Sequence, residues 1–174
     1  MIIGHGDIAS VVSKKDSKNY LYFASGVSNS QETRESEYQR EKDLLMKQDK
    51  TQHIIYFSSL SIFYANTRYT RHKIEMEELI KKHFKHNTIF RLGNITWGKN
   101  PHTLINFLRD KIKRGEEVEI RPVYRYIVDE AELLHWIDLL PLSSHIMNCE
   151  MNITGRRMLV EDVVKEYIYG ARNV

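Results

Sequence analysis

Hydrophobic residues fall into short runs that alternate with longer amphipathic stretches along the chain. Apolar runs bounded by polar or small residues predict strands at Met1–Ile3, Tyr20–Ala24, His53–Ser58, Thr88–Leu92 and Ile146–Asn152. Stretches with helical spacing of apolar residues predict helices at Asp7–Ser13, Gln31–Gln48, Arg68–His83, His102–Arg114, Asp129–Leu139 and Val160–Tyr169. This alternation favours parallel βαβ units, and therefore an α/β fold with a mostly parallel sheet flanked by helices.

The composition narrows the class of protein only slightly. A chain of 174 residues, 41% hydrophobic and 28% charged, has room for one globular domain. Its net charge of +3 suits an anionic small molecule as well as a nucleic acid. The single cysteine, Cys149, excludes an internal disulfide and indicates a reducing compartment, and its surroundings predict a buried strand residue. No membrane span or signal peptide is recognisable, so we expect a cytoplasmic protein.

A tyrosine and a lysine four residues apart give the first indication of chemistry. Tyr69 and Lys73 lie in a predicted helix, where this spacing places both side chains on one face. A lysine ammonium beside a tyrosine lowers the pKa of the phenol, which then exchanges protons more readily near neutral pH. Ser59, after a predicted strand, would hold the same substrate oxygen, and Ser58 would take this place if the register differs by one.

A glycine-rich segment follows the first predicted strand. The residues Gly4-His5-Gly6-Asp7-Ile8-Ala9 form a G-x-G-x-x-A pattern at the start of a predicted helix. In dinucleotide-binding folds such glycines allow a tight turn and a close approach of the pyrophosphate to the backbone. The acidic ribose ligand expected about 20 residues later is not evident. Asp16 is better explained as a solvated loop residue, and Lys14 and Lys15 lie close after the loop, so we lean slightly to NADP over NAD.

These motifs belong to a longer series of segments in a characteristic order. The segments are Gly4–Ala9, Leu21–Gly26, Ile55–Phe63, Tyr69–Glu77, Phe90–Gly98, Tyr126–Ala131 and Met151–Gly155. In this order they resemble the extended branch of the short-chain dehydrogenase/reductase superfamily, which contains nucleotide-sugar epimerases and dehydratases. In this resemblance Leu21–Gly26 corresponds to the fourth strand and the loop that follows it.

The resemblance implies roles for particular residues. Tyr69 would be the acid and base, Lys73 would bind the nicotinamide ribose and tune Tyr69, and Ser59 would orient the reacting oxygen. The implied cofactor contacts are Gly4, His5, Gly6, Asp7, Ile8, Ser25, Gly26, Tyr69, Lys73, Leu92 and Asn94. The implied substrate contacts are Asn94 and Arg125. Arg121 or Arg125 would suit an anionic diphosphate, although a solvated position is the simpler interpretation of both.

The chain also departs from the family pattern. It resembles a member without the second and third strands, so the pocket for the adenine end of the cofactor would be reduced. We therefore expect a single reduced Rossmann-like domain over residues 1–174, with a cofactor part at about 1–100 and an abbreviated substrate-binding part at about 101–174. The predicted helices starting at Gln31 and Arg68 would supply a homodimer interface, as their counterparts do in many members.

Two functions remain open. The first is an NAD(P)-dependent oxidoreductase or epimerase that acts on a nucleotide-activated sugar through Ser59, Tyr69 and Lys73. The alternative is a dinucleotide-binding protein of the same fold with little or no sugar turnover. A metal site is not expected, because His83 and His86 lack further ligands at suitable spacing. The basic residues of 109–114 alternate with acidic and apolar ones, so a nucleic-acid partner is not expected. A membrane partner is not expected either, because no apolar stretch is long enough for a membrane span.

Overall fold

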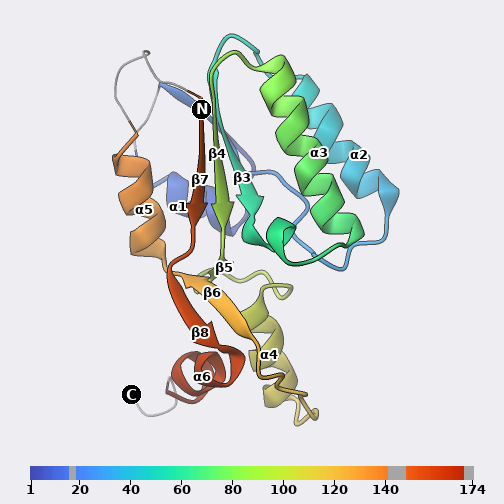
Figure 1. Ribbon diagram of the computed structural model, residues 1–174, viewed down its shortest axis with the longest axis vertical. Coiled ribbons are helices and arrows are strands. Elements are labelled where there is room, and N and C mark those ends of the chain that lie inside the picture. Colours follow the sequence, from blue (N-terminus) through green and yellow to red (C-terminus); the bar gives the residue numbers. More distant parts are fainter. Residues whose placement is uncertain (16–18, 141–147, 171–174) are drawn as a thin grey trace.

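The main sheet is parallel throughout. The computed structural model of the protein describes residues 1–15, 19–140 and 148–170. In spatial order the sheet consists of β1 (Ile2–Ile3), β2 (Tyr20–Phe23), β3 (His53–Ser59), β4 (Asn87–Leu92) and β7 (Cys149–Ile153). Helices flank this sheet on both sides (Figure 1). The arrangement confirms the predicted α/β, Rossmann-like fold.

Both faces of the main sheet are buried, which explains why its strands read as continuous apolar runs. Tyr20, Tyr22 and Ile55 pack toward α1 (Asp7–Val12) and α5 (Glu130–Asp138). The alternate residues, Leu21 and Phe23 among them, pack toward α2 (Glu35–Met46) and α3 (Arg68–His83). Burial of each large apolar side chain contributes roughly 1.5–3 kcal/mol. The two hydrophobic layers hold the carboxyl ends of the strands in fixed positions.

A second, three-stranded sheet lies below the first in Figure 1 and was not predicted. It has the order β5 (Asn94–Ile95), β6 (Tyr124–Val128) and β8 (Arg156–Leu159), and it is accompanied by α4 (Leu104–Lys113) and α6 (Val160–Val164). A π-helical segment, Lys165–Tyr169, continues α6. Strands β5 and β8 escaped prediction because β5 has only two residues and β8 begins with two exposed arginines.

Three other expectations need correction or fall outside the described part. Helix α2 starts at Glu35, four residues later than predicted. Cys149 lies in a strand as expected but is partly exposed, because β7 is the last strand of the sheet. Ile146, Met147 and Asp16 lie outside the described residues. None of the described helices has the length and apolar character needed to cross a membrane.

Strand β1 lies at the other edge of the main sheet. In the common doubly wound order the first strand lies between the second and the fourth. Here the described residues give β1 a single neighbour, β2, which corresponds in the resemblance to the fourth strand. This order fits a chain that goes directly from the first strand to the fourth.

Candidate functional site

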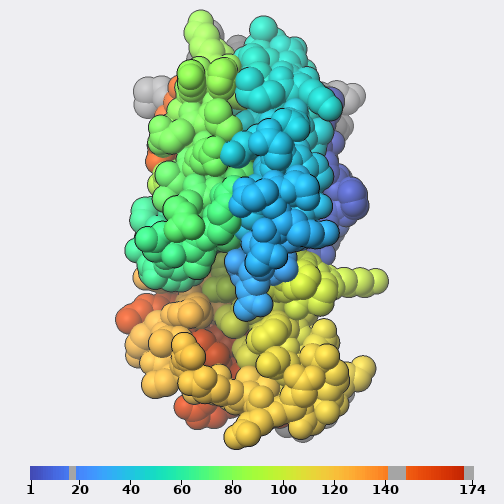
Figure 2. Space-filling view, turned by 90° about the vertical axis from the view of Figure 1, so that its right-hand side faces the viewer, coloured from blue at the N-terminus to red at the C-terminus, as the bar shows by residue number. Residues whose placement is uncertain are grey.

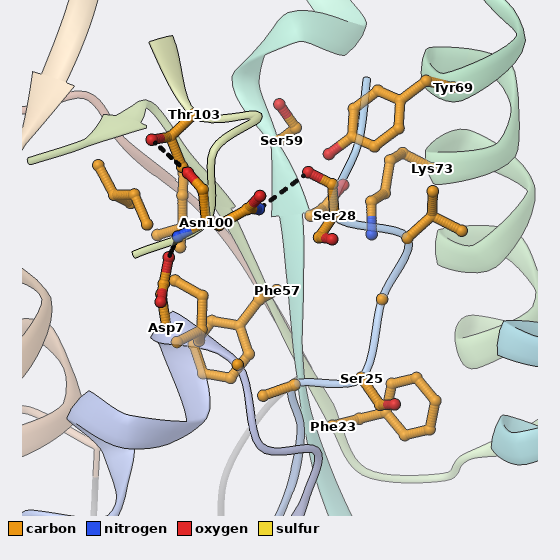
Figure 3. Close-up of a pocket in the computed structure, with 18 of the residues that line it drawn as sticks. Asp7, Phe23, Ser25, Ser28, Phe57, Ser59, Tyr69, Lys73, Asn100 and Thr103 are labelled. Carbon is orange, nitrogen blue, oxygen red and sulfur yellow. Dashed lines mark hydrogen bonds between the residues drawn. The ribbon is translucent and has the colours of Figure 1, made fainter. Parts of the chain in front are cut away.

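A cavity of about 680 Å³ opens at the carboxyl ends of the parallel strands. Open α/β sheets commonly bind ligands at this edge. The walls come from the segments that follow β1 and β2, from the ends of β3 and β4, and from α3 (Figure 3). The predicted site residues among its lining are His5, Gly6, Asp7, Ile8, Ser25, Gly26, Ser59, Tyr69, Lys73 and Leu92. Folding thus brings most of the predicted site together.

The two glycines of the first loop have different surroundings. Gly4 has φ +120°, and a Cβ there would lie 2.4 Å from the carbonyl oxygen of Ala24, so this position needs glycine. Gly4 itself lies outside the described cavity lining. A Cβ at Gly6 would meet no atom of the described residues within 4 Å. The open space over Gly6 therefore leaves room for a ligand to approach the backbone.

Asp7 joins the glycine loop to the segment that follows β5. Its carboxylate accepts hydrogen bonds from the backbone N–H groups of Lys99, at 3.0 Å, and Asn100, at 3.1 Å. Asn100 in turn donates from Nδ2 to the carbonyl oxygen of Ser28, at 3.2 Å (Figure 3). Gly98 makes this approach possible, because a Cβ there would lie 2.0 Å from the Asp7 carboxyl carbon. These bonds link two walls of the cavity.

Ser59 ends β3 and begins a short 3-10 helix, Leu60–Phe63. Its Oγ accepts a hydrogen bond from the Ser61 N–H, at 3.2 Å, and lies 2.8 Å from Ser61 Oγ. When Ser61 donates, the Ser59 hydrogen is free for a ligand. Ser58 also lines the cavity, and its buried Oγ has no hydrogen-bond partner among the described residues. Both serines thus stay candidates for the hydroxyl that orients a substrate oxygen.

Tyr69 and Lys73 both project from α3 into the cavity wall. The helix begins with a capping box in which Thr67 and Thr70 satisfy each other's backbone N–H groups, which fixes the first turn. The Tyr69 hydroxyl points into the space beside Ser59 and Ser28 (Figure 3). Lys73 Nζ lies 5.7 Å from the centroid of the Tyr69 ring. The sequence spacing therefore places both side chains at one site.

Lys73 is held by a buried cluster that sequence reasoning missed. Its Nζ donates to the hydroxyl of Tyr56, at 2.9 Å, and to Oε1 of Glu41, at 3.3 Å. Tyr56 donates to the same Glu41 oxygen, at 2.9 Å. The other carboxylate oxygen of Glu41 accepts from the Val27 N–H, at 2.7 Å, and from His72 Nε2, at 2.9 Å. Glu41 could have been suspected because it shares the inward face of α2 with Tyr38 and Leu45.

The cluster shifts the pKa values of its members. Burial would raise the pKa of Glu41, but Lys73 and the hydrogen bonds from His72 and Val27 outweigh it and lower the pKa to about 2. Burial would lower the pKa of Lys73, but Glu41 raises it. Burial and Glu41 together raise the pKa of the Tyr56 hydroxyl well above its usual value. Glu41 and Lys73 are therefore a charged pair at neutral pH.

The pair makes stability dependent on acid pH. Because the pKa of Glu41 falls from 4.5 to about 2 on folding, the unfolded chain binds more protons between these values. The stabilisation is complete above about pH 4.5 and is lost as the pH falls toward 2, by roughly 3 kcal/mol. We expect the difference in unfolding free energy between the wild type and Glu41→Gln to shrink over this range in urea titrations. A constant difference would contradict the assignment.

A second cavity of about 780 Å³ adjoins the first and shares Ser59, Tyr69 and Leu92 with it. It lies between the main sheet with its helices and the smaller sheet, where the surface in Figure 2 is indented. Asn94, Arg125 and Arg121 line it. Asn94 donates to the carbonyl oxygen of Tyr126, at 3.2 Å. The Arg125 guanidinium lies 5.7 Å from the centre of the Tyr64 ring.

Lys14 and Lys15, the residues that favoured NADP in the sequence, form ion pairs outside the first cavity. Lys14 forms an ion pair with Glu130, and Lys15 forms one with Asp138, at 2.6 Å. Both acidic residues belong to α5, and neither lysine lines the first cavity. These ion pairs link the turn after α1 to α5. The lean to NADP is therefore not supported.

Comparison with solved structures shows what the fold resembles. MoeE5 in complex with UDP-glucuronic acid and NAD superposes with a TM-score of 0.70 at 18% identity, covering 88% of this chain and 62% of MoeE5. The dTDP-glucose 4,6-dehydratase from Bacillus anthracis, in complex with NAD, gives 0.62 at 14% identity, covering 91% and 59%. The UDP-N-acetylglucosamine 4-epimerase from Methanobrevibacter ruminantium gives 0.57 at 13% identity, covering 89% and 61%. The chain shares their fold.

The chain resembles these structures in fold and over part of their length. The chain spans about three fifths of these structures. No protein-family model and no curated protein sequence matches it.

Proposed function

We propose that the protein binds a nicotinamide dinucleotide in the first cavity and a nucleotide-activated sugar in the second, and acts on the sugar as an oxidoreductase or epimerase. The observation that carries this proposal is the meeting of Ser59, Tyr69 and Lys73 with the glycine loop around one cavity. Two observations on similar structures support it. MoeE5 forms complexes with NAD and UDP-glucuronic acid or UDP-glucose, and the dTDP-glucose 4,6-dehydratase forms a complex with NAD.

The residues of the first cavity fit a dinucleotide. The open space over Gly6 would admit the pyrophosphate. Arg40 also lines the cavity, where its guanidinium donates to the Ser25 carbonyl oxygen at 3.3 Å and brings positive charge toward the phosphates. Lys73 would donate to a ribose hydroxyl from the same wall. We propose NAD as the cofactor, since the lysines that suggested NADP are engaged with α5.

The residues around Tyr69 would carry the proton chemistry. When bound, the nicotinamide ring supplies or accepts a hydride. Tyr69 would exchange a proton with a sugar hydroxyl or carbonyl oxygen, and Ser59 would hold that oxygen by a hydrogen bond. In the second cavity, Arg125 and Arg121 would face the anionic diphosphate and Asn94 the sugar.

The homodimer stays a prediction. The surfaces of α2 and α3 include the exposed apolar residues Met46 and Ile74, which could contribute to such an interface.

Titration calorimetry followed by a substrate panel tests the proposal. We expect NAD(H) to bind more tightly than NADP(H), and Gly6→Ala to weaken binding roughly tenfold, or about 1.4 kcal/mol, because the methyl group would fill the ligand's space. An unchanged melting temperature of Gly6→Ala serves as the control, since a Cβ there meets no protein atom. Absence of binding, or clearly tighter NADP(H) binding, would contradict the cofactor assignment.

The panel offers UDP- and dTDP-sugars together with the cofactor, with nicotinamide absorbance and product chromatography as readouts. Turnover of any member supports an enzyme. Cofactor binding without turnover of any sugar would favour the alternative, a dinucleotide-binding protein of the same fold.

A further inference from the structure

Glu41 is a buried carboxylate for which the proposed chemistry has no role. It lies on α2, five residues before the end of the helix, and its side chain is 0% exposed. The neighbours on the same helix face, Tyr38 and Leu45, are also fully buried. A charged group in such a position destabilises a fold unless its oxygens are bonded and its charge is balanced.

The partners of Glu41 come from three separate parts of the fold. They are the Val27 N–H in the segment after β2, the Tyr56 hydroxyl on β3, and His72 and Lys73 on α3. Each carboxylate oxygen accepts two of these hydrogen bonds. Glu41 therefore ties together three segments, all of which contribute lining residues to the first cavity.

Among the described residues, Lys73 has hydrogen-bond acceptors for two of its three ammonium hydrogens. Of its three hydrogens, one goes to Tyr56 and one to Glu41. The backbone of Gly26 covers the ammonium so closely that a Cβ there would lie 2.7 Å from Nζ. The ammonium lies within the cavity wall, and the remaining hydrogen is available to a ligand.

We propose that Glu41 is a positioning residue for Lys73: it holds the buried ammonium at the cavity wall and keeps it charged, so that its third hydrogen can be donated to a ligand. The inference rests on the proposed function only for the identity of that ligand, a ribose hydroxyl of the cofactor.

The other charged groups near Lys73 cannot replace Glu41. The titratable groups that face Lys73 are Glu41 on α2, Tyr56 on β3, and Tyr69, His72 and Glu77 on α3. The Glu77 carboxylate is bound by the Arg91 guanidinium, at 2.6 Å. Arg40 on α2 adds only positive charge near Ser25. Without the Glu41 charge, burial would act largely unopposed and lower the pKa of Lys73.

The direct test follows the Lys73 ammonium by NMR in the full chain carrying ¹⁵N-labelled lysine side chains, with Lys73→Arg used for assignment. In the wild type we expect the titration midpoint of Lys73 to lie above that of an ordinary lysine, about 10.4. In Glu41→Gln we expect it to fall by at least about one pH unit. Glu78→Gln is the matched control, because Glu78 lies on the same helix as Lys73 and is 70% exposed. An unchanged midpoint in Glu41→Gln would overturn the proposal.

A second variant keeps the test decisive if Glu41→Gln does not fold. Glu41→Asp retains the charge but shortens the reach by one methylene group, so we expect a smaller fall of the Lys73 midpoint and weaker cofactor binding. A wild-type midpoint together with wild-type binding in Glu41→Asp would also overturn the proposal.

Cofactor titrations over pH separate this proposal from the proposed function. If the proposed function is right, the pH above which NAD(H) binding is lost moves toward neutral pH in Glu41→Gln and stays unchanged in Glu78→Gln. We call this pH the alkaline limit of binding. A shifted Lys73 midpoint with no cofactor binding at any pH would confirm the role of Glu41 and refute the dinucleotide. A cofactor that binds with the same alkaline limit in wild type and Glu41→Gln would refute the role of Glu41 alone.

Discussion

Replacing Tyr69 with phenylalanine should reduce turnover of a nucleotide sugar by about 100- to 10,000-fold, the usual contribution of a positioned acid–base group. The substitution removes only the hydroxyl that faces Ser59 in the cavity, and the ring that lines the wall remains. Cofactor affinity measured by calorimetry should therefore stay nearly unchanged while the steady-state turnover number falls.

Tyr124→Phe is the control for this substitution. Tyr124 lies on β6 outside both described cavity linings, half exposed and with its ring against the Arg157 guanidinium. The same loss of a hydroxyl there should leave turnover at the wild-type level. Full activity of Tyr69→Phe would refute the proton-transfer role, and a large loss of cofactor affinity would mean that the phenol mainly binds the cofactor.

Replacing Lys73 with methionine should lower the free energy of unfolding by about 3–5 kcal/mol, the cost of leaving a buried charge without its partner. Methionine fills nearly the same volume. The loss therefore comes chiefly from the Glu41 carboxylate, which stays buried without its positively charged partner. Urea denaturation followed by circular dichroism measures it. Lys165→Met is the control, since Lys165 and Glu161 form an exposed pair at 2.6 Å that should contribute less than about 1 kcal/mol.

Combining Lys73→Met with Glu41→Gln should recover part of that stability. The amide removes the unpaired charge, so the double variant should be more stable than Lys73→Met alone by at least about 1 kcal/mol. If the two losses simply add, Glu41 and Lys73 do not depend on each other, and the buried ion pair contributes little to the fold.

The sequence predicted the elements whose side chains alternate between two buried layers, as in β3, and the amphipathic α3. It failed where strands are short or half exposed, as in β5 and β8, because their apolar residues are too few to form a pattern. Local spacing also sufficed to place Tyr69 and Lys73 together. An element or site can thus be predicted where it depends on neighbouring residues, and prediction fails where it depends on residues distant in the chain.

The buried cluster illustrates that limit. Glu41 and Lys73 are 32 positions apart. Only the helix face that Glu41 shares with Tyr38 and Leu45 distinguishes it from the solvated acidic residues around it. The same holds for Lys14 and Lys15, whose partners on α5 lie more than 100 positions away. Such long-range pairs determine which charges remain available to a ligand, and they changed the interpretation of the cofactor more than any single motif.

Strands β4 and β7 are neighbours in the main sheet, although β5 and β6 of the smaller sheet lie between them in the chain. The pairing of β4 with β7, from Thr88 with Cys149 to Leu92 with Ile153, holds both ends of the intervening segment 93–148. The length of this segment therefore affects its closure entropy only slowly, by about 0.6 kcal/mol for each doubling. Insertions into its exposed turn at 113–117 would therefore leave β3 and α3, which carry Ser59, Tyr69 and Lys73, in place.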